Sequence, residues 1–336
     1  MDSDDILAGL LATMEFEDTP PNDSPPTTGN QGKQDLEDQC QWAIGGNGKF
    51  MPVGATLRQL QPGIYEPFAT PGQYGMELMS IASDGIYELP DMATDAVLKE
   101  AAMFWQNERK YRDHNLLYKR GLLLWGAPGS GKTITIKLLM NTLVKNGGIV
   151  LLGSNIHLTV LCLKSIRRIE PTRNLIVVLE DIDEIINSNG EAPVLSMLDG
   201  EHNIDRVLNL ASTNYPERLG ARIINRPSRF DRRIYVGMPG PEARKVYLEK
   251  TTKNGLDMDT LNQWVSDTAG MSIAHLRELV AAVYCLDQPY GEVLERLRAM
   301  SVPVKGEEGF AAKKLGFGAR TGARAIKWDE SDVGIA

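Results

Sequence analysis

The spacing of hydrophobic positions changes several times along this chain, and each change marks an expected boundary between structural units. Residues 4–16 place five apolar side chains at helical spacing among acidic ones, which predicts a short amphipathic helix. Residues 42–90 contain short apolar segments separated by Gly, Pro and Tyr, which is typical of short β-strands joined by turns. From about residue 94 to residue 113 the apolar spacing is helical again.

The middle of the chain alternates between strand-sized apolar runs and helical stretches. This alternation predicts an α/β domain built on a doubly wound parallel sheet. The expected strands are residues 121–126, 149–153, 175–179, 207–213 and 232–238. Residues 241–300 show no strand pattern and contain about four helical stretches, so we expect a small helical subdomain there.

These patterns divide the chain into five expected parts. They are an acidic, disordered tail with a short helix at 1–40, a small β-rich N-terminal module at 41–90, an α/β domain at 91–240, a helical lid at 241–300, and a basic flexible tail at 301–336. Ten acids and one lysine give the first 40 residues a net charge of −9. Since the whole chain carries −8, the remainder is close to neutral and is not a strongly charged nucleic-acid binder.

Composition excludes several other classes of protein. The three cysteines form no CxxC pair and the four histidines are scattered, which argues against a disulfide framework and against zinc. No apolar run approaches the roughly 20 residues that span a bilayer. The N-terminus is acidic where a signal peptide would be basic, so we expect a cytoplasmic protein without a membrane partner.

A phosphate-binding motif lies between an expected strand and an expected helix. The sequence GAPGSGKT matches G-x-x-x-x-G-K-[ST], whose glycines let backbone N–H groups curl around phosphate oxygens at a helix N-terminus. Lys132 is placed to reach the β and γ phosphates, and the Thr133 hydroxyl to bind Mg²⁺. The expected nucleotide-binding residues are Gly126, Ala127, Pro128, Gly129, Ser130, Gly131, Lys132 and Thr133.

Two adjacent carboxylates, Glu180 and Asp181, follow the expected strand at 175–179. In that position one carboxylate can hold a hydrated metal ion while the next orients or deprotonates the attacking water. The alternative is a solvated charge run at a strand end. The distance of about fifty residues from the phosphate-binding motif favours the catalytic interpretation.

Two later elements add polar groups. Asn214 ends the expected strand at 207–213, where an amide can position the lytic water or contact the γ-phosphate, although such residues also form turns. Residues 225–233, NRPSRFDRR, carry more guanidinium charge than Asp231 neutralises. This segment is either a source of arginine fingers for a neighbouring subunit or a solvated basic loop that binds an acidic partner.

In this order and spacing, these four elements resemble the AAA family of ATPases over about residues 85–300. The segments LEDID, VLSMLDG and ASTNYPERL are most similar to the branch that contains the mitochondrial Rieske-protein translocase, although no membrane anchor like that of the translocase is expected here. The resemblance implies Glu180 on the metal side, so that Mg²⁺ is bound by Thr133 and Glu180, partly through water. It further implies Asp181 as the catalytic base, Asn214 as sensor 1, and Arg226 and Arg229 as arginine fingers.

The main hypothesis is therefore a Mg-ATP hydrolase of the AAA+ type with ATP and Mg²⁺ as cofactors. It is expected to work as a homo-oligomeric ring, a hexamer, that remodels or assembles a protein complex in a chaperone-like way. One alternative is a nucleic-acid motor or loader that uses the basic residues 311–327, which are otherwise a disordered tail or a binding segment for an acidic neighbour. A second is an ATP-dependent scaffold with slow turnover. Residues 4–16 are either a docking peptide for a partner or a frayed end.

Overall fold

The structure is a computed structural model of the 336-residue chain. It describes residues 41–44, 50–53, 57–70, 73–80, 87, 89–90, 93–199, 204–224, 226, 228–253 and 255–300. The expectations for the two tails, including the helix at 4–16 and the basic segment at 311–327, lie outside the described residues.

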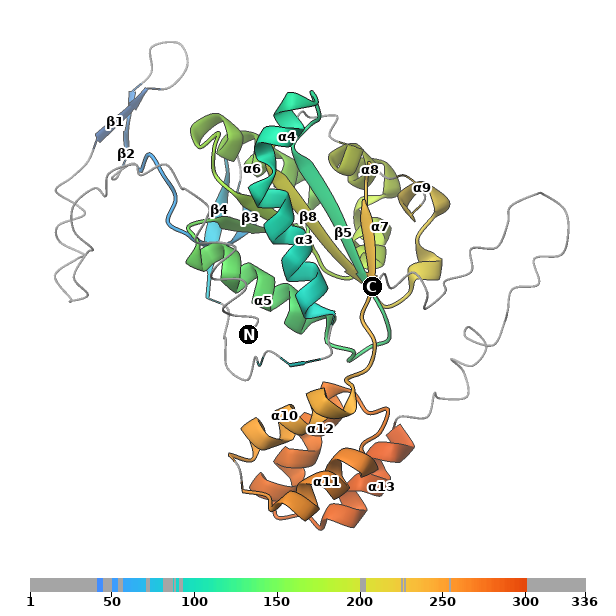
Figure 1. The fold of residues 1–336 in the computed structure, drawn as a ribbon. Coiled ribbons are helices and arrows are strands. Elements are labelled where there is room, and N and C mark those ends of the chain that lie inside the picture. Colours follow the sequence, from blue (N-terminus) through green and yellow to red (C-terminus); the bar gives the residue numbers. More distant parts are fainter. Residues whose placement is uncertain are drawn as a thin grey trace, which may run out of the picture.

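A seven-stranded sheet forms the centre of the molecule, in the order β4-β3-β6-β7-β8-β5-β9 (Figure 1). All neighbouring strands run parallel except β3 and β4. The strands are β3 (Gly63–Thr70), β4 (Gln73–Met79), β5 (Lys119–Trp125), β6 (Ile149–Leu152), β7 (Leu175–Leu179), β8 (Val207–Thr213) and β9 (Arg232–Tyr235). The predicted α/β fold with a largely parallel sheet is confirmed.

Helices cover both faces of this sheet because its central strands are apolar on both sides. In β7, Leu175, Val177 and Leu179 belong to one hydrophobic core, while Ile176 and Val178 belong to the other. The first core is covered by α6 (Ile156–Ile169), α7 (Ile182–Asn189), α8 (Glu191–Asp199) and α9 (Ala221–Ile224). The second is covered by α3 (Thr94–Gln106) and α5 (Lys132–Lys145).

The N-terminal strands differ from the separate module expected at residues 41–90. Among the strands that the structure describes in this segment, β1 (Gln41–Ile44) and β2 (Phe50–Val53) form a sheet of their own. In contrast, β3 pairs with β6, with Gly63 opposite Ile149, so β3 and β4 extend the sheet of the α/β domain. Burial explains this pairing, since Ile64 and Tyr65 of β3 pack into the two cores of that domain.

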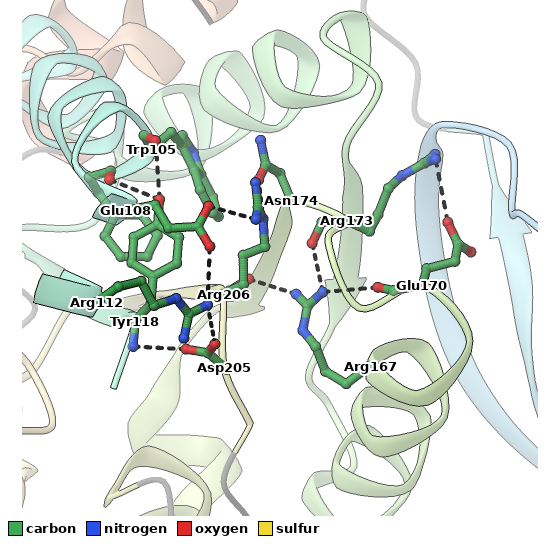
Figure 2. A network of polar contacts seen from close by, with 11 residues as sticks. Trp105, Glu108, Arg112, Tyr118, Arg167, Glu170, Arg173, Asn174, Asp205 and Arg206 are labelled. Carbon is green, nitrogen blue, oxygen red and sulfur yellow. Dashed lines mark hydrogen bonds and ion pairs between the residues drawn. The ribbon is translucent and has the colours of Figure 1, made fainter. Parts of the chain in front are cut away.

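A polar network holds the amino ends of the strands together (Figure 2). Arg206, which precedes β8, donates to Asn174 at 3.0 Å and pairs with Glu108 of α4 (Glu108–Asp113) at 2.6 Å. Arg167 of α6 donates to the carbonyls of Arg173 and Arg206 at 2.7 and 2.6 Å, and burial lowers the pKa of its guanidinium to about 10. This network ties α4 and α6 to the edge opposite the carboxyl ends of the strands.

Residues 241–300 form a helical unit that Figure 1 shows below the sheet. It has a hydrophobic core of its own, centred on Leu248, Trp264 and Leu279. Its elements are α10 (Pro241–Thr251), α11 (Met258–Asp267), α12 (Ile273–Val280), the π-helix η3 (Ala281–Cys285) and α13 (Tyr290–Met300). Among the described residues, none of the helices combines the length and the apolar character required to cross a membrane.

Candidate nucleotide-binding site

The phosphate-binding motif forms the loop between β5 and α5. Gly131 caps the N-terminus of α5. Its φ of 106° is a backbone conformation that residues with a Cβ rarely adopt. Gly129 has φ 76°, and a Cβ at this position would lie 2.7 Å from the Oγ of Ser272. Ser272 caps the N-terminus of α12, so the loop also touches the helical unit.

The Lys132 ammonium is enclosed by its own loop. The residue is 6% exposed, and its Nζ donates to the carbonyls of Gly126 and Ala127 at 2.8 and 2.9 Å. Burial lowers the pKa of Lys132, and the nearby Asp181 carboxylate acts in the opposite direction. The Ser130 hydroxyl is also buried and has no hydrogen-bond partner among the described residues. A buried amine, an orphaned hydroxyl and the N-terminus of a 14-residue helix together fit a phosphate group.

Thr133 and Glu180 bring two oxygen donors together from different elements. Thr133 belongs to the first turn of α5, and Glu180 follows the end of β7. The Thr133 Oγ1 donates to Glu180 Oε2 at 3.0 Å. Hydroxyl and carboxylate oxygens are ligands that Mg²⁺ prefers, so this donor pair fits a divalent cation beside the phosphate loop.

Asp181 and Asn214 meet because β7 and β8 are neighbours whose carboxyl ends share one edge. Leu179 lies opposite Ala211 at the end of this ladder. Asn214 Nδ2 then donates to Asp181 Oδ1 at 3.1 Å, and the Asp181 backbone N–H donates to Ser212 Oγ at 3.3 Å. Asp181 has φ 48°, a left-handed conformation that costs a non-glycine residue free energy and often occurs at functional sites.

The two predicted arginine fingers lie away from this site, at the amino end of β5. Arg229 is 4% exposed and donates to both carboxylate oxygens of Asp199, at 2.7 and 2.6 Å. Arg226 is 63% exposed and lies 3.4 Å from Asp199. Lys119, the first residue of β5, donates to the Ser228 carbonyl at 2.8 Å. The structure therefore does not bring these arginines to the phosphate loop of their own chain.

Several residues without an expected catalytic or binding role lie around the site or beside the arginine loop. Asp183 and Thr213 form a buried hydrogen bond beside Asp181 and Asn214. Asp199 holds Arg229, and Ser272 reaches the phosphate loop from the helical unit. The sequence signal for Asp183 was its place in the acidic run after β7, whereas a role for Asp199 required the fold. A parallel sheet with a phosphate loop and an acidic pair at its carboxyl edge defines a P-loop nucleoside-triphosphatase domain.

Comparison with known proteins narrows this class. Residues 122–238 match the family described as "ATPase family associated with various cellular activities (AAA)", so the chain carries an AAA ATPase domain. This match runs from β5 to just beyond β9 and includes every predicted catalytic residue.

Several curated proteins are similar to this chain over part of its length. An ATPase family protein 2 homolog of Caenorhabditis elegans is 33% identical over 178 residues, covering 46% of this chain and 24% of that protein. An ATP-dependent zinc metalloprotease FtsH of Caldicellulosiruptor bescii is 28% identical over 208 residues, 54% of this chain and 33% of the relative. Proteasome-activating nucleotidase 2 of Haloferax volcanii is 30% identical over 179 residues, 46% of this chain and 43% of the relative. The chain thus spans less than half the length of these relatives, and its resemblance to the Rieske-protein translocase branch stays a prediction.

Proposed function

We propose that this protein hydrolyses ATP with Mg²⁺ and uses the turnover to remodel or assemble a protein complex. The observation that carries the proposal is the gathering of three pieces at one edge of the sheet. These are the enclosed Lys132, the Thr133–Glu180 pair, and the Asp181–Asn214 pair. The relatives named as a proteasome-activating nucleotidase and an ATP-dependent protease support a role directed at proteins.

Phosphate binding requires Lys132 to exchange partners. Its Nζ gives up the carbonyls of Gly126 and Ala127 for phosphate oxygens, while the N–H groups of the loop and α5 surround the same phosphates. Thr133 and Glu180 would hold Mg²⁺, which when bound neutralises charge on the β and γ phosphates.

Hydrolysis is assigned to the neighbouring pair. Asp181 accepts a proton from water as the water oxygen bonds to the γ-phosphorus and the bond to the β–γ bridging oxygen breaks. Asn214 holds the Asp181 carboxylate through its hydrogen bond of 3.1 Å and senses the γ-phosphate. Asp181 can serve as the base because the Asn214 amide fixes the orientation of its carboxylate.

The arginines are assigned to a neighbouring subunit in a homo-oligomeric ring, a hexamer. Arg226 is the residue that reaches outward, since 63% of its side chain is exposed. Arg229 contributes from behind it by anchoring the loop, because its guanidinium donates to both oxygens of Asp199 and to the Arg222 carbonyl. This division refines the expectation that both arginines touch the neighbour's nucleotide.

The test is specific ATPase activity as a function of protein concentration. Wild type, Asp181→Asn, Arg226→Ala and an equimolar mixture of the two variants are compared. Activity of the wild type should rise with concentration, each variant alone should be inactive, and the mixture should regain activity because some interfaces combine an intact Asp181 with an intact Arg226. The matched control is Arg222→Ala, which removes another exposed arginine of the same region and should keep activity.

Two outcomes would contradict the proposed function and favour another one. Concentration-independent activity with an active Arg226→Ala variant would rule out shared sites and indicate a monomeric nucleotide switch. A ring that assembles with ATP but does not turn over would support the scaffold alternative.

A further inference from the structure

A buried acid beside the catalytic pair has no part in the mechanism above. Asp183 lies two residues after Asp181 and is 5% exposed. Its Oδ1 accepts a hydrogen bond of 2.8 Å from Thr213 Oγ1, and Thr213 is fully buried. Neither side chain belongs to the phosphate loop or to the Thr133–Glu180 pair.

The Thr213 hydroxyl is held on two sides. It donates to Asp183 and accepts the backbone N–H of Tyr215 at 3.0 Å. A hydroxyl has one donor, so this arrangement uses it and fixes the rotamer. Because Thr213 and Tyr215 flank Asn214 in the chain, the hydrogen bonds fix the backbone on both sides of the sensing amide.

The hydrogen bond between Thr213 and Asp183 also restrains the segment that follows the neighbouring strand β7. Asp181 and Asp183 flank Ile182, which is fully buried, so holding Asp183 also limits movement of Asp181. Three side-chain links therefore join the ends of β7 and β8. Their lengths are 3.3 Å for Asp181 N–H to Ser212, 3.1 Å for Asn214 to Asp181, and 2.8 Å for Thr213 to Asp183. The shortest of them, between Thr213 and Asp183, is buried and involves none of the atoms assigned to catalysis.

The charge of Asp183 is balanced from the surface side. Arg218 Nη1 lies 3.7 Å from Asp183 Oδ2, and its guanidinium stacks 3.8 Å from the centre of the Tyr215 ring. Asp183 is therefore held by a hydroxyl on one oxygen and faces a cation on the other, as a buried carboxylate requires.

We propose that Asp183 and Thr213 are a positioning pair that sets the separation of Asn214 and Asp181 for water activation. The inference rests on the proposed function and adds residues to it. Because the phosphate loop is untouched, loss of the pair should reduce kcat and leave nucleotide affinity nearly unchanged. Loss of partners that orient metal ligands typically costs about 10–100-fold in metal affinity or activity, and we expect a factor of the same order here.

The experiment measures kcat, KM for ATP, nucleotide Kd and melting temperature for three variants of the full chain. Thr213→Val removes the hydroxyl and keeps the shape, and its kcat should fall by about 10–100-fold with Kd changed less than about twofold. Thr213→Ser keeps the hydroxyl and should restore most of the lost kcat. Thr268→Val is the matched control, since Thr268 is also fully buried but bonds the Trp264 carbonyl in the core of the helical unit.

The outcomes separate this inference from the proposed function. If the wild type has no ATPase activity, the proposed function is wrong, and the inference about the Asp183–Thr213 pair fails with it. An active wild type whose Thr213→Val variant keeps its kcat overturns the positioning pair alone. If Thr213→Val and Thr268→Val lose kcat equally, in proportion to their melting temperatures, the hydroxyl is only structural and the inference is wrong.

Discussion

Arg226 and Arg229 stand three residues apart in one loop, yet the structure places them in opposite environments. Arg229 is buried against both oxygens of Asp199, and Arg226 is largely exposed. Replacing each by alanine should therefore separate an effect on folding from an effect on hydrolysis. We expect Arg229→Ala to destabilise the α/β domain, and Arg226→Ala to change its stability by no more than about 1 kcal/mol while lowering activity.

The expected magnitudes follow from burial. Removing one partner of a buried ion pair costs about 3–5 kcal/mol of the free energy of unfolding, because the remaining charge loses its compensation. Asp199 is 18% exposed, so water and Arg226 compensate part of that loss. We therefore expect about 2–3 kcal/mol for Arg229→Ala. The exposed pair of Arg226 is worth at most about 1 kcal/mol.

Urea unfolding followed by tryptophan fluorescence measures the first effect, with Trp125 reporting from the end of β5. With a slope of about 1–3 kcal/mol per molar urea, the Arg229→Ala midpoint should fall by about 1 M. ATPase assays well below the transition measure the second effect. If Arg226 supplies charge to a neighbour's transition state, its removal should lower kcat by about 10³-fold.

The reasoning would be refuted by either of two results. An Arg229→Ala variant with the wild-type midpoint would mean that the pair with Asp199 does not anchor the loop. An Arg226→Ala variant that unfolds as early as Arg229→Ala would mean that the exposed side chain is structural. Asp199→Asn is the complementary variant and should shift the midpoint in the same direction as Arg229→Ala.

Three other parts of the α/β domain give measurable expectations. A Cβ at Gly121 would collide with the Arg229 carbonyl, so Gly121→Ala should cost about 1–3 kcal/mol of stability in thermal melts. Gly147→Ala is the control, because a Cβ at Gly147 would meet no atom within 4 Å and only the backbone φ of 79° disfavours alanine. Its cost in stability should be about 1 kcal/mol, which is common for such backbone strain. ATP at about 100 times its Kd should stabilise wild type by about 2.7 kcal/mol in thermal-shift assays, but not Lys132→Ala. The hydrogen bond from Arg229 holds the pKa of Asp199 below its ordinary value of 3.8. The stability that this Arg229–Asp199 pair contributes is therefore complete above pH 3.8 and is lost as the pH falls through the lowered pKa. Urea midpoints should therefore decline more steeply below about pH 4 for wild type than for Arg229→Ala.

The parts of the fold that sequence predicted well are those with a local physical signal. Buried parallel strands are continuous apolar runs, so β7 was visible as LIVVL at residues 175–179. The phosphate loop was visible because its glycines and lysine must occur at fixed spacing between a strand and a helix. The hydrogen bond between Asp181 and Asn214 was not predicted, although adjacent parallel strands bring their carboxyl ends to the same edge of a sheet.

The remaining features depend on contacts between residues far apart in sequence. Nothing local in Gly63–Thr70 indicates that this strand pairs with β6, about 86 residues later, so a separate module was expected. The division between Arg226 and Arg229 likewise depends on Asp199, which the fold brings to Arg229 from the end of α8. A sequence pattern can identify a basic loop, but only the position of its counter-charge decides which arginine is available.

The strand β5 connects the two halves of the proposed active site. At its carboxyl end it continues into the phosphate loop, and at its amino end it holds the arginine loop. Gly121 N–H donates to Asp231 at 2.7 Å, and the Asp231 N–H donates back to the Gly121 carbonyl at 2.8 Å. β8 and β9 pair with β5 on both sides, so its backbone has little freedom to deform between these ends. The phosphate loop and the arginine loop thus lie at the two ends of one seven-residue strand, and a displacement at either end has no flexible segment of β5 to absorb it.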